Sequence, residues 1–358
     1  MTFRSLLTGH DTIECAYYLR PVEAGCLLDF EALAAQREAL RQSKSHNPKP
    51  IQLGSEEFLL ASHGTGSGYP FLIENDAFSI QFGEFNKPNF FVTYRSVALW
   101  HQSAHGLHER FMTWAASVGL VPYRPESLSR VDFTFDYYLP LIDFDEDNFI
   151  SDADKDAQHR KNGKIQTFRF GSEVIVLRIY NKCAEIEEKS HKTWFYELWG
   201  MDHDVWRIEW QVRKTVMRLV GIRTFEGLKE RQGDLLRLLV KQHTTLRIKT
   251  DDSNRSRWPL HPLWQDLTER VNQMEGLGVV RELDMEALLD ERLARIGISI
   301  YGYLKRIAAI NCLQTGKQKA YVDETFERLK FMVDGVHDPL TWQQDVKRRM
   351  TEMRLGEW

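Results

Sequence analysis

Three segments of the chain alternate between apolar and polar residues, and this period-two pattern is the strongest constraint on the fold. The segments read SRVDFTFDYYL (129–139), VIVLRIYNK (174–182) and VWRIEWQVRK (205–214). Successive side chains of a strand point to opposite faces, so each segment has an apolar face and a face of charged residues or tyrosine. Such strands form antiparallel sheets whose apolar side packs on helices. We therefore predict an α+β fold with an antiparallel sheet and helices on one of its faces.

The first 255 residues of the 358-residue chain mix strand-like and helix-like segments in two successive sets. In the first set, strand patterns occupy 11–19, 77–82 and 89–96, and helical spacing occupies 29–42 and 97–119. The second set contains the three alternating segments and a helix-like stretch after residue 182. This order suggests one domain over 1–255 with two halves of similar layout, 1–125 and 126–255.

Beyond residue 255 the strand patterns give way to helical spacing. A polar stretch with prolines, TDDSNRSRWPLHPLW (250–264), precedes four helix-like segments. A change of composition at a proline-bearing connector is typical of a domain boundary. We expect a helical domain over 256–358 that serves DNA recognition, partner contact or dimerisation.

Composition indicates the cellular compartment but does not identify a binding partner. The net charge is −4, which by itself gives no indication of nucleic acid binding. The four cysteines form no CxxC pair, which argues for free thiols in a reducing compartment. No apolar run approaches the roughly 18 residues of a membrane helix, and the first residues have no signal-peptide core. We expect a cytoplasmic protein with no membrane partner.

The polar faces of the three alternating strands would meet if these strands lie in one sheet. They would gather carboxylates and cations around Tyr180; the carboxylates are Asp132, Asp136 and Glu209, and the cations are Arg178, Lys182 and Arg207. Carboxylates without histidine or cysteine suit Mg²⁺ or Mn²⁺, and the cations suit a phosphate and its transition-state charge. A tyrosine among these groups can act as a nucleophile on phosphorus. The alternative is that these charged residues only form the solvent-exposed face of amphipathic strands.

A basic stretch over 207–257 offers further contacts to a phosphate backbone. The residues that we expect to contact DNA are Arg130, Gln211, Arg213, Lys214 and Arg218. A solvated helix face is the alternative interpretation of this basic stretch.

Four short motifs, in order and at these spacings, resemble the replication initiation factor family. They are SRVDFTFD, FRFGS, LRIYNKCAE and WRIEWQVRK, and they lie within about residues 125–225. The family comprises the Rep_trans-type initiators of rolling-circle replication in plasmids and filamentous phages, and related relaxases of conjugative elements. The tyrosine of its motif matches Tyr180, and its acids match Asp132 and Glu209, with Asp136 as a further candidate.

The resemblance implies an enzyme that nicks and rejoins one DNA strand at an origin through a 5′-phosphotyrosine and leaves a 3′ hydroxyl. A relaxase for conjugative transfer uses the same chemistry, and an origin-binding protein that does not cut is the alternative from another class. Expected partners are origin DNA, as duplex, hairpin or single strand, a host helicase, and a second copy of the chain. Tyr137, Tyr138 and Tyr196 are the alternative nucleophiles.

Overall fold

The computed structural model describes residues 3–22, 25, 27–43, 47–275 and 285–354. The chain forms two compact units, Met1–Leu283 and Asp284–Trp358. The first unit contains every strand and eight of the eleven α-helices of the described residues, and the second is helical.

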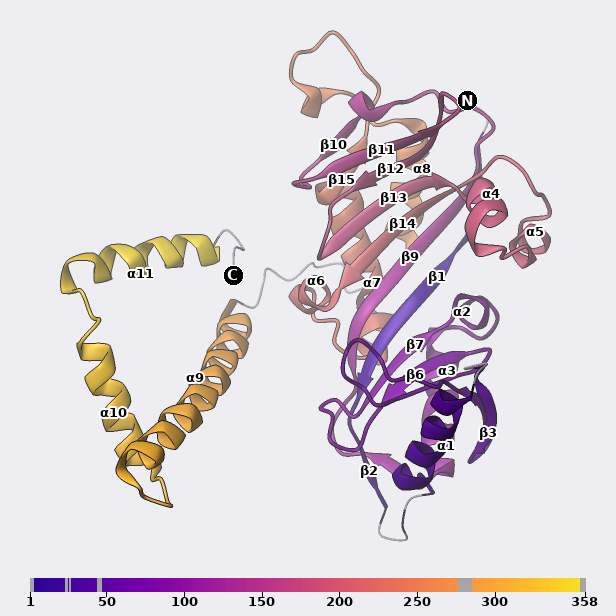
Figure 1. The fold of residues 1–358 in the computed structure, drawn as a ribbon. Helices are drawn as coiled ribbons and strands as arrows, with labels where there is room; N and C mark the ends of the chain where they lie inside the picture. The colour runs from indigo at the N-terminus through magenta and orange to yellow at the C-terminus, as the bar shows by residue number, and fades with distance from the viewer. Residues whose placement is uncertain (1–2, 23–24, 26, 44–46, 276–284, 355–358) are drawn as a thin grey trace. The chain divides into compact units, whose positions relative to one another are not determined.

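The first unit is built on an 11-stranded antiparallel sheet, which confirms the predicted fold class (Figure 1). In spatial order its strands are β11 (Asp156–Lys161), β12 (Lys164–Phe170), β13 (Ile175–Asn181), β14 (Val205–Arg213), β9 (Ser127–Tyr138), β1 (Arg4–Tyr17), β7 (Phe90–Tyr94), β6 (Phe78–Phe82), β5 (Phe71–Glu74), β4 (Glu56–Leu60) and β3 (Lys49–Leu53). Two small sheets pair β2 (Leu19–Pro21) with β8 (Leu120–Pro122) and β10 (Phe149–Ser151) with β15 (Thr244–Leu246). The three alternating segments are β9, β13 and β14.

The two halves of the unit share one layout. The longest strands, β1 and β9, pair at the centre of the sheet, and the other strands of each half extend outward from them. The strand next to each central strand, β7 or β14, leads directly into two helices. These helices are α2 (Ser96–Gln102) and α3 (Ala104–Ser117) in the first half, and α6 (Lys214–Leu219) and α7 (Phe225–Leu238) in the second. The predicted single helix over 97–119 is thus two helices, because Ser103 adopts a φ of 65° between them.

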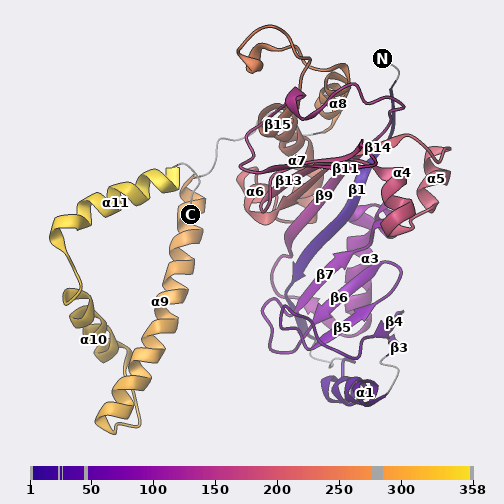
Figure 2. The ribbon, with the colours of Figure 1, turned by 45° about the horizontal axis from the view of Figure 1, so that its top comes forward.

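The main core lies between the apolar face of the sheet and a helical layer formed by α3, α7 and α8 (Pro262–Gln273). Figure 2 shows α7 and α8 beside the second half of the sheet and α3 beside the first. Three tryptophans are fully buried in this core: Trp114 of α3, Trp210 of β14 and Trp264 of α8. The ring centroids of Trp210 and Trp264 are 5.8 Å apart in an edge-on contact. The alternating apolar residues of the strands therefore face helices, as predicted.

A second, smaller core covers one end of the polar face. It is formed by α4 (Lys182–Glu185), the single turn η2 (Ile186–Ser190) and α5 (Trp194–Trp199), with Trp100 of α2 packed against it. Its buried residues include Cys183, Phe195 and Trp199. The polar face therefore has a covered end and an open end, a division that the strand pattern does not contain.

The remaining described elements are short turns and peripheral helices. They are α1 (Phe30–Gln42), η1 (Glu146–Asn148), η3 (Leu239–His243) and η4 (Arg255–Arg257). The predicted cap of α1 is present, since the Asp29 side chain accepts a hydrogen bond from the Ala32 amide.

The boundary between the units lies later in the chain than residue 255. Helix α8 packs in the first unit through Leu263, Trp264, Leu267 and Val271, all of which are buried. The polar connector 250–264 is therefore an internal loop of the first unit, and the predicted boundary is corrected to Leu283–Asp284.

The second unit consists of α9 (Met285–Thr315), α10 (Val322–Asp334) and α11 (Pro339–Arg354). Leu304 of α9 and Thr325 of α10 are buried where these two helices pack. Across the part of the chain that the structure describes, no helix is both long and apolar enough to cross a membrane.

We predict that Trp264→Ala lowers the free energy of unfolding of the first unit by about 3–5 kcal/mol, the usual cost of emptying a large buried aromatic site. The control is Trp342→Ala in α11, where the side chain is 53% exposed and the expected change is under about 0.5 kcal/mol. Urea denaturation of the full chain, followed by circular dichroism, measures both. Equal effects of the two substitutions would place α8 outside the core of the first unit.

Candidate active site

The sheet brings most of the predicted site residues onto one surface. β14 lies between β9 and β13, so its polar side chains have neighbours on both sides. Across β13 and β14, Arg178 lies opposite Glu209 and Tyr180 lies opposite Arg207. Across β9 and β14, Asp132 lies opposite Gln211. Residues that are directly opposite on antiparallel strands share a face, which explains why three distant segments form one site.

Tyr180 is held by a carboxylate that is itself fixed by an arginine. Its hydroxyl donates to Glu209 Oε2 at 2.8 Å, and Arg178 Nη1 donates to Glu209 Oε1 at 2.8 Å. Arg178 also donates from Nη2 to Gln211 at 3.1 Å. A nucleophile, a base within hydrogen-bond reach and a third group that orients the base form the arrangement expected of an activated nucleophile.

A second ion-pair network lies beside this one on β9 and β1. Arg130 Nε donates to Asp132 Oδ1 at 2.8 Å, and its Nη1 donates to Glu14 at 3.2 Å. Glu14 also accepts from Arg213 at 3.0 Å. Asp132 is buried, whereas Arg130 and Arg213 are half-buried. The predicted residues Arg130, Asp132 and Arg213 are therefore connected through Glu14, which sequence patterns did not single out.

Asp136 and Arg207 take no part in the open surface, which corrects their expected roles. Both side chains are completely inaccessible to solvent. Arg207 donates to both oxygens of Asp136, at 2.6 and 2.9 Å, and Asp136 also accepts from the Trp199 indole at 3.0 Å. Neither group can reach a metal ion or a substrate, because α5 covers them. Asp136 is a structural partner of Arg207 rather than a metal ligand, and Arg207 acts on the site only through its charge.

Lys182 lies at the edge between the covered and the open part of the polar face. Its side chain is 3% exposed, and its ammonium donates to Glu185 at 2.6 Å. The ammonium lies 5.6 Å from the centroid of the Tyr180 ring. Burial and the charge of Arg207 lower the pKa of Lys182.

A cavity of about 600 Å³ opens above Tyr180. Its lining includes eight Lys or Arg side chains (Arg130, Arg160, Lys161, Arg169, Arg178, Lys182, Lys189 and Lys192) and five Asp or Glu side chains (Asp11, Asp132, Glu185, Glu188 and Glu209). This excess of three positive charges contrasts with the net charge of −4 of the whole chain. The cavity is therefore suited to an anionic ligand such as a phosphate.

Several of these lining residues were missed by the sequence patterns. Arg169 and Thr167 could have been found, because they alternate on β12 and lie opposite Arg178 and Tyr180. Asp11 could not, because the pairing of β1 with β9 is irregular between His10 and Thr12, so strand alternation does not predict its direction. In the structure Asp11 accepts from Arg207 at 2.8 Å and from Lys192 at 3.2 Å.

The electrostatics of the site follow from burial and from close pairs of like charge. Burial raises the pKa of Tyr180 well above its usual value; the charge of Glu209 acts in the same direction, and Arg207 opposes it. Burial likewise raises the pKa of Asp132 to about 6, with the hydrogen bond from Arg130 opposing the shift and the charge of Glu209 adding to it. The free site thus has a protonated tyrosine beside two carboxylates that repel each other.

Two of the predicted DNA contacts, Lys214 and Arg218, lie on α6 and do not line this cavity. Arg218 is half-buried and donates to Ser127 Oγ at 3.4 Å, and Lys214 is exposed. Their contact with DNA stays a prediction.

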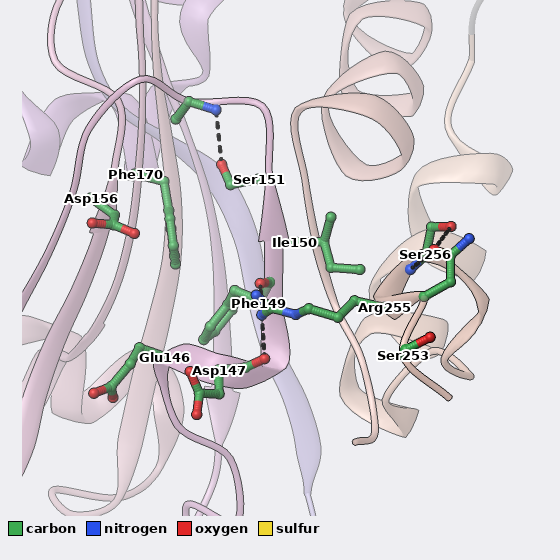
Figure 3. A pocket seen from close by; sticks show the side chains of 12 residues that line it. Glu146, Asp147, Phe149, Ile150, Ser151, Asp156, Phe170, Ser253, Arg255 and Ser256 are labelled. Carbon is green, nitrogen blue, oxygen red and sulfur yellow. Dashed lines mark hydrogen bonds between the residues drawn. The ribbon is translucent and has the colours of Figure 1, made fainter. Parts of the chain in front are cut away.

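A larger cavity, of about 710 Å³, lies between the segment around β10 and residues 253–256 (Figure 3). Figure 3 shows that the carboxylates of Glu146, Asp147 and Asp156 line it. Its arginine, Arg255, is already bound to the backbone carbonyls of Asp147 and Phe149. This cavity is unsuited to a phosphate because it is lined by three carboxylates and its arginine is already bound to backbone carbonyls. The Tyr180 cavity is therefore the candidate site.

No family model matches the chain, and no curated protein matches it. The chain is similar to the solved structure of the rolling circle replication initiator protein from Geobacillus stearothermophilus, with a TM-score of 0.46 and 17% sequence identity. The match covers 75% of this chain and 98% of the other.

We predict that Asp136→Ala lowers the free energy of unfolding by about 3–5 kcal/mol, because it leaves the buried charge of Arg207 without its main partner. The control is Glu74→Ala, which breaks the half-exposed Arg95–Glu74 pair, 2.8 Å long, and should cost under about 1 kcal/mol. Chemical denaturation of both variants measures the difference. A loss at Asp136 no larger than that at Glu74 would contradict the structural role of this pair.

Proposed function

We propose that the chain is a rolling-circle replication initiator that nicks and rejoins one DNA strand through Tyr180. The observation that carries this proposal is the hydrogen bond from the Tyr180 hydroxyl to Glu209, with Arg178 fixing the carboxylate, in a cavity with excess positive charge. The motifs that resemble the replication initiation factor family surround the same residues.

In the proposed reaction Glu209 Oε2 accepts the phenolic proton and the Tyr180 oxygen attacks the scissile phosphorus. The P–O3′ bond breaks as the Tyr–O–P bond forms, which leaves a 5′-phosphotyrosine and a 3′ oxygen that takes up a proton. We assign the donation of that proton to Lys182, whose pKa is lowered and whose ammonium lies 5.6 Å from the centroid of the Tyr180 ring. The reverse attack by the 3′ hydroxyl rejoins the strand without ATP, because the energy of the broken bond is kept in the phosphotyrosine.

The proposed binding residues for the scissile phosphate are Arg169 and Arg178. They lie directly opposite each other on β12 and β13, a like-charge pairing that is unfavourable unless an anion is close. Arg178 is partly neutralised by Glu209, whereas Arg169 forms no ion pair with any residue that the structure describes. A phosphate between the two guanidinium groups would be bound by charge-assisted hydrogen bonds.

A divalent cation is part of the proposal, and the donor chemistry fits it in part. Asp132 and Glu209 supply hard oxygen donors, and the pKa of Asp132 is raised mainly by burial, with the charge of Glu209 adding to the shift and Arg130 opposing it. Three or more Asp, Glu, His or Cys groups do not converge on one point anywhere in the described ranges. Mg²⁺ often binds one or two carboxylates and completes its shell with water and substrate phosphate. When bound, Mg²⁺ or Mn²⁺ would polarise the scissile phosphate.

Replacement of the Tyr180 hydroxyl tests the nucleophile. We predict that Tyr180→Phe abolishes both the nick and the covalent protein–DNA adduct, while binding to origin DNA stays within about twofold, since the ring and its packing are kept. The measurement uses supercoiled plasmid that carries the replication origin of the DNA encoding this chain. The plasmid is incubated with the protein and Mg²⁺, and relaxed DNA and the covalent adduct are detected on gels.

The matched control is Tyr196→Phe on α5, one of the alternative nucleophiles, which should form the adduct at the wild-type level. An adduct formed by the Tyr180→Phe variant would show that Tyr180 is not the nucleophile. Wild-type protein that binds the origin but neither nicks nor links to it would instead support the alternative of a non-cutting origin-binding protein.

Neutral replacements test the two carboxylates. We predict that Glu209→Gln slows nicking by about 10²–10⁴-fold, because the amide cannot accept the phenolic proton. Asp132→Asn and Glu209→Gln should both weaken Mn²⁺ binding in calorimetry, whereas Glu14→Gln on the same face should not. If both variants bind Mn²⁺ like the wild type, the cation site lies elsewhere.

A further inference from the structure

Two tyrosines and an arginine meet at the end of β1 that is remote from α4, beside β2 (Figure 1). They are Tyr18, between β1 and β2, and Tyr123 and Arg124, directly after β8. The two rings meet edge-on with their centroids 6.2 Å apart, and the guanidinium carbon of Arg124 lies 3.9 Å from the centroid of the Tyr18 ring. The Tyr123 amide also donates to the Tyr18 carbonyl at 3.0 Å. We call these three residues the tyrosine–arginine cluster.

The cluster is fixed by the fold and yet exposed. Tyr18 is half-buried, the Tyr123 ring is 49% exposed, and Arg124 is exposed. A ring that is already held by a second ring loses little conformational entropy when a ligand binds to it. Nucleobases stack on exposed aromatic rings, and arginine side chains bind the phosphates between the bases. The cluster therefore has the chemistry of a nucleotide-binding surface.

The cluster lies on the same face of the sheet as the Tyr180 cavity. Cys15, Tyr17 and Leu19 belong to the main core, so the side chain of Tyr18 points to the opposite, polar face. Thr12, six residues earlier on that polar face, lines the Tyr180 cavity. Six residues of a strand span about 20 Å, which is therefore the distance from the cavity to the cluster along β1.

A row of arginines occupies this distance. Arg130, which lines the Tyr180 cavity, and Arg213 both donate to Glu14 of β1, at 3.2 and 3.0 Å. Further along, Arg218 donates at 3.4 Å to Ser127 of β9, which pairs with β1 two residues before the cluster begins. The arginine of the cluster follows. We call these four residues, Arg130, Arg213, Arg218 and Arg124, the arginine row.

The arginine row keeps an excess of positive charge. Glu14 is shared between two of its members, and Glu126 accepts a hydrogen bond from the Phe225 amide at 3.1 Å. Even with both carboxylates counted, four arginines face two acids. A line of positive charge that begins at the proposed site of strand cleavage suits the phosphate backbone of DNA.

The aromatic rings on this face indicate a single strand rather than a duplex. Besides the cluster, Phe91 of β7 lies on the polar face opposite Ala16 of β1 and is half-buried. Bases in a duplex are stacked on each other and offer no ring face to a protein side chain, whereas an unpaired strand does. Arginines interleaved with aromatic rings are the combination that binds single strands without a sequence preference.

We propose that the tyrosine–arginine cluster is a subsite for single-stranded DNA. A base stacks on the exposed ring of Tyr123, the ring of Tyr18 fixes that platform, and Arg124 binds the phosphate of the same nucleotide. From there the strand follows the arginine row to the Tyr180 cavity. The subsite rests on the proposed function, because it assigns an unpaired stretch of DNA to one side of the scissile phosphate.

The test is the affinity of the full chain for a fluorescein-labelled thymidine oligonucleotide of about 12 nucleotides, a usual length for a single-strand site, measured by fluorescence anisotropy. Tyr123→Ala should weaken binding by about 5- to 150-fold, the fold-change equivalent to a stacking contribution of about 1–3 kcal/mol per base. Tyr123→Phe keeps the ring and should bind within about twofold of the wild type.

The matched control is Tyr301→Ala in α9, which should also bind within about twofold of the wild type. The Tyr301 ring is 52% exposed and has the Lys305 ammonium 4.4 Å from its centroid, so it resembles the cluster in exposure and in its neighbouring cation. Arg124→Gln is the second variant of the cluster. It should weaken binding and reduce the slope of log affinity against log salt by about 0.7, the value for one phosphate contact on a single strand.

Unchanged affinity in Tyr123→Ala, or an equal loss in Tyr301→Ala, would overturn the subsite. A wild-type chain that does not bind the oligonucleotide, or an equal loss of affinity for a duplex of the same length, would overturn it as well. The oligonucleotide lacks the origin, so this result does not depend on strand cleavage. A chain that forms no adduct at its origin but loses oligonucleotide affinity with Tyr123→Ala would contradict the nicking function and support the subsite.

Discussion

The buried guanidinium of Arg207 is the interaction on which the active-site half of the sheet depends. It is bound by Asp136 of β9 and Asp11 of β1, so three adjacent strands are connected through one cation. A buried charge without partners would be strongly destabilising, and the paired geometry with several hydrogen bonds offsets the loss of hydration. The ring of Phe195 of α5 lies 4.5 Å from the guanidinium and seals the pair from water.

This pair also defines where chemistry can occur on the polar face. Toward α5 the strands present acids and arginines that are neutralised and covered, and these serve the fold. Two residues further along β14, Glu209 lies at the margin of the open cavity and holds Tyr180. Because Arg207 lies directly opposite Tyr180 on the neighbouring strand, its charge opposes the effect of burial on the tyrosine. The same residue therefore stabilises the sheet and limits the rise in the pKa of the proposed nucleophile.

The two units use apolar surface in different ways. In the first unit, tryptophans from the sheet and from α3 and α8 meet in a closed core, and its exposed large hydrophobic residues are few for its size. In the second unit most large apolar side chains are exposed, although their spacing along α9 is regular. Burial of apolar surface is the main source of folding and association free energy.

Asp132, Asp136 and Arg207 show which features of the site the sequence predicts and which it does not. Period-two alternation correctly predicted the antiparallel sheet and the shared face of Asp132, Arg178, Tyr180 and Glu209, because side-chain direction in a strand is a local property of the backbone. It could not separate Asp132 from Asp136, which have the same pattern, because helix α5 covers only one of them. Nor could it find Asp11, which follows an irregularity in strand pairing, or assign α8 to the first unit. These outcomes depend on which distant segments pack together, so only the tertiary structure decided them.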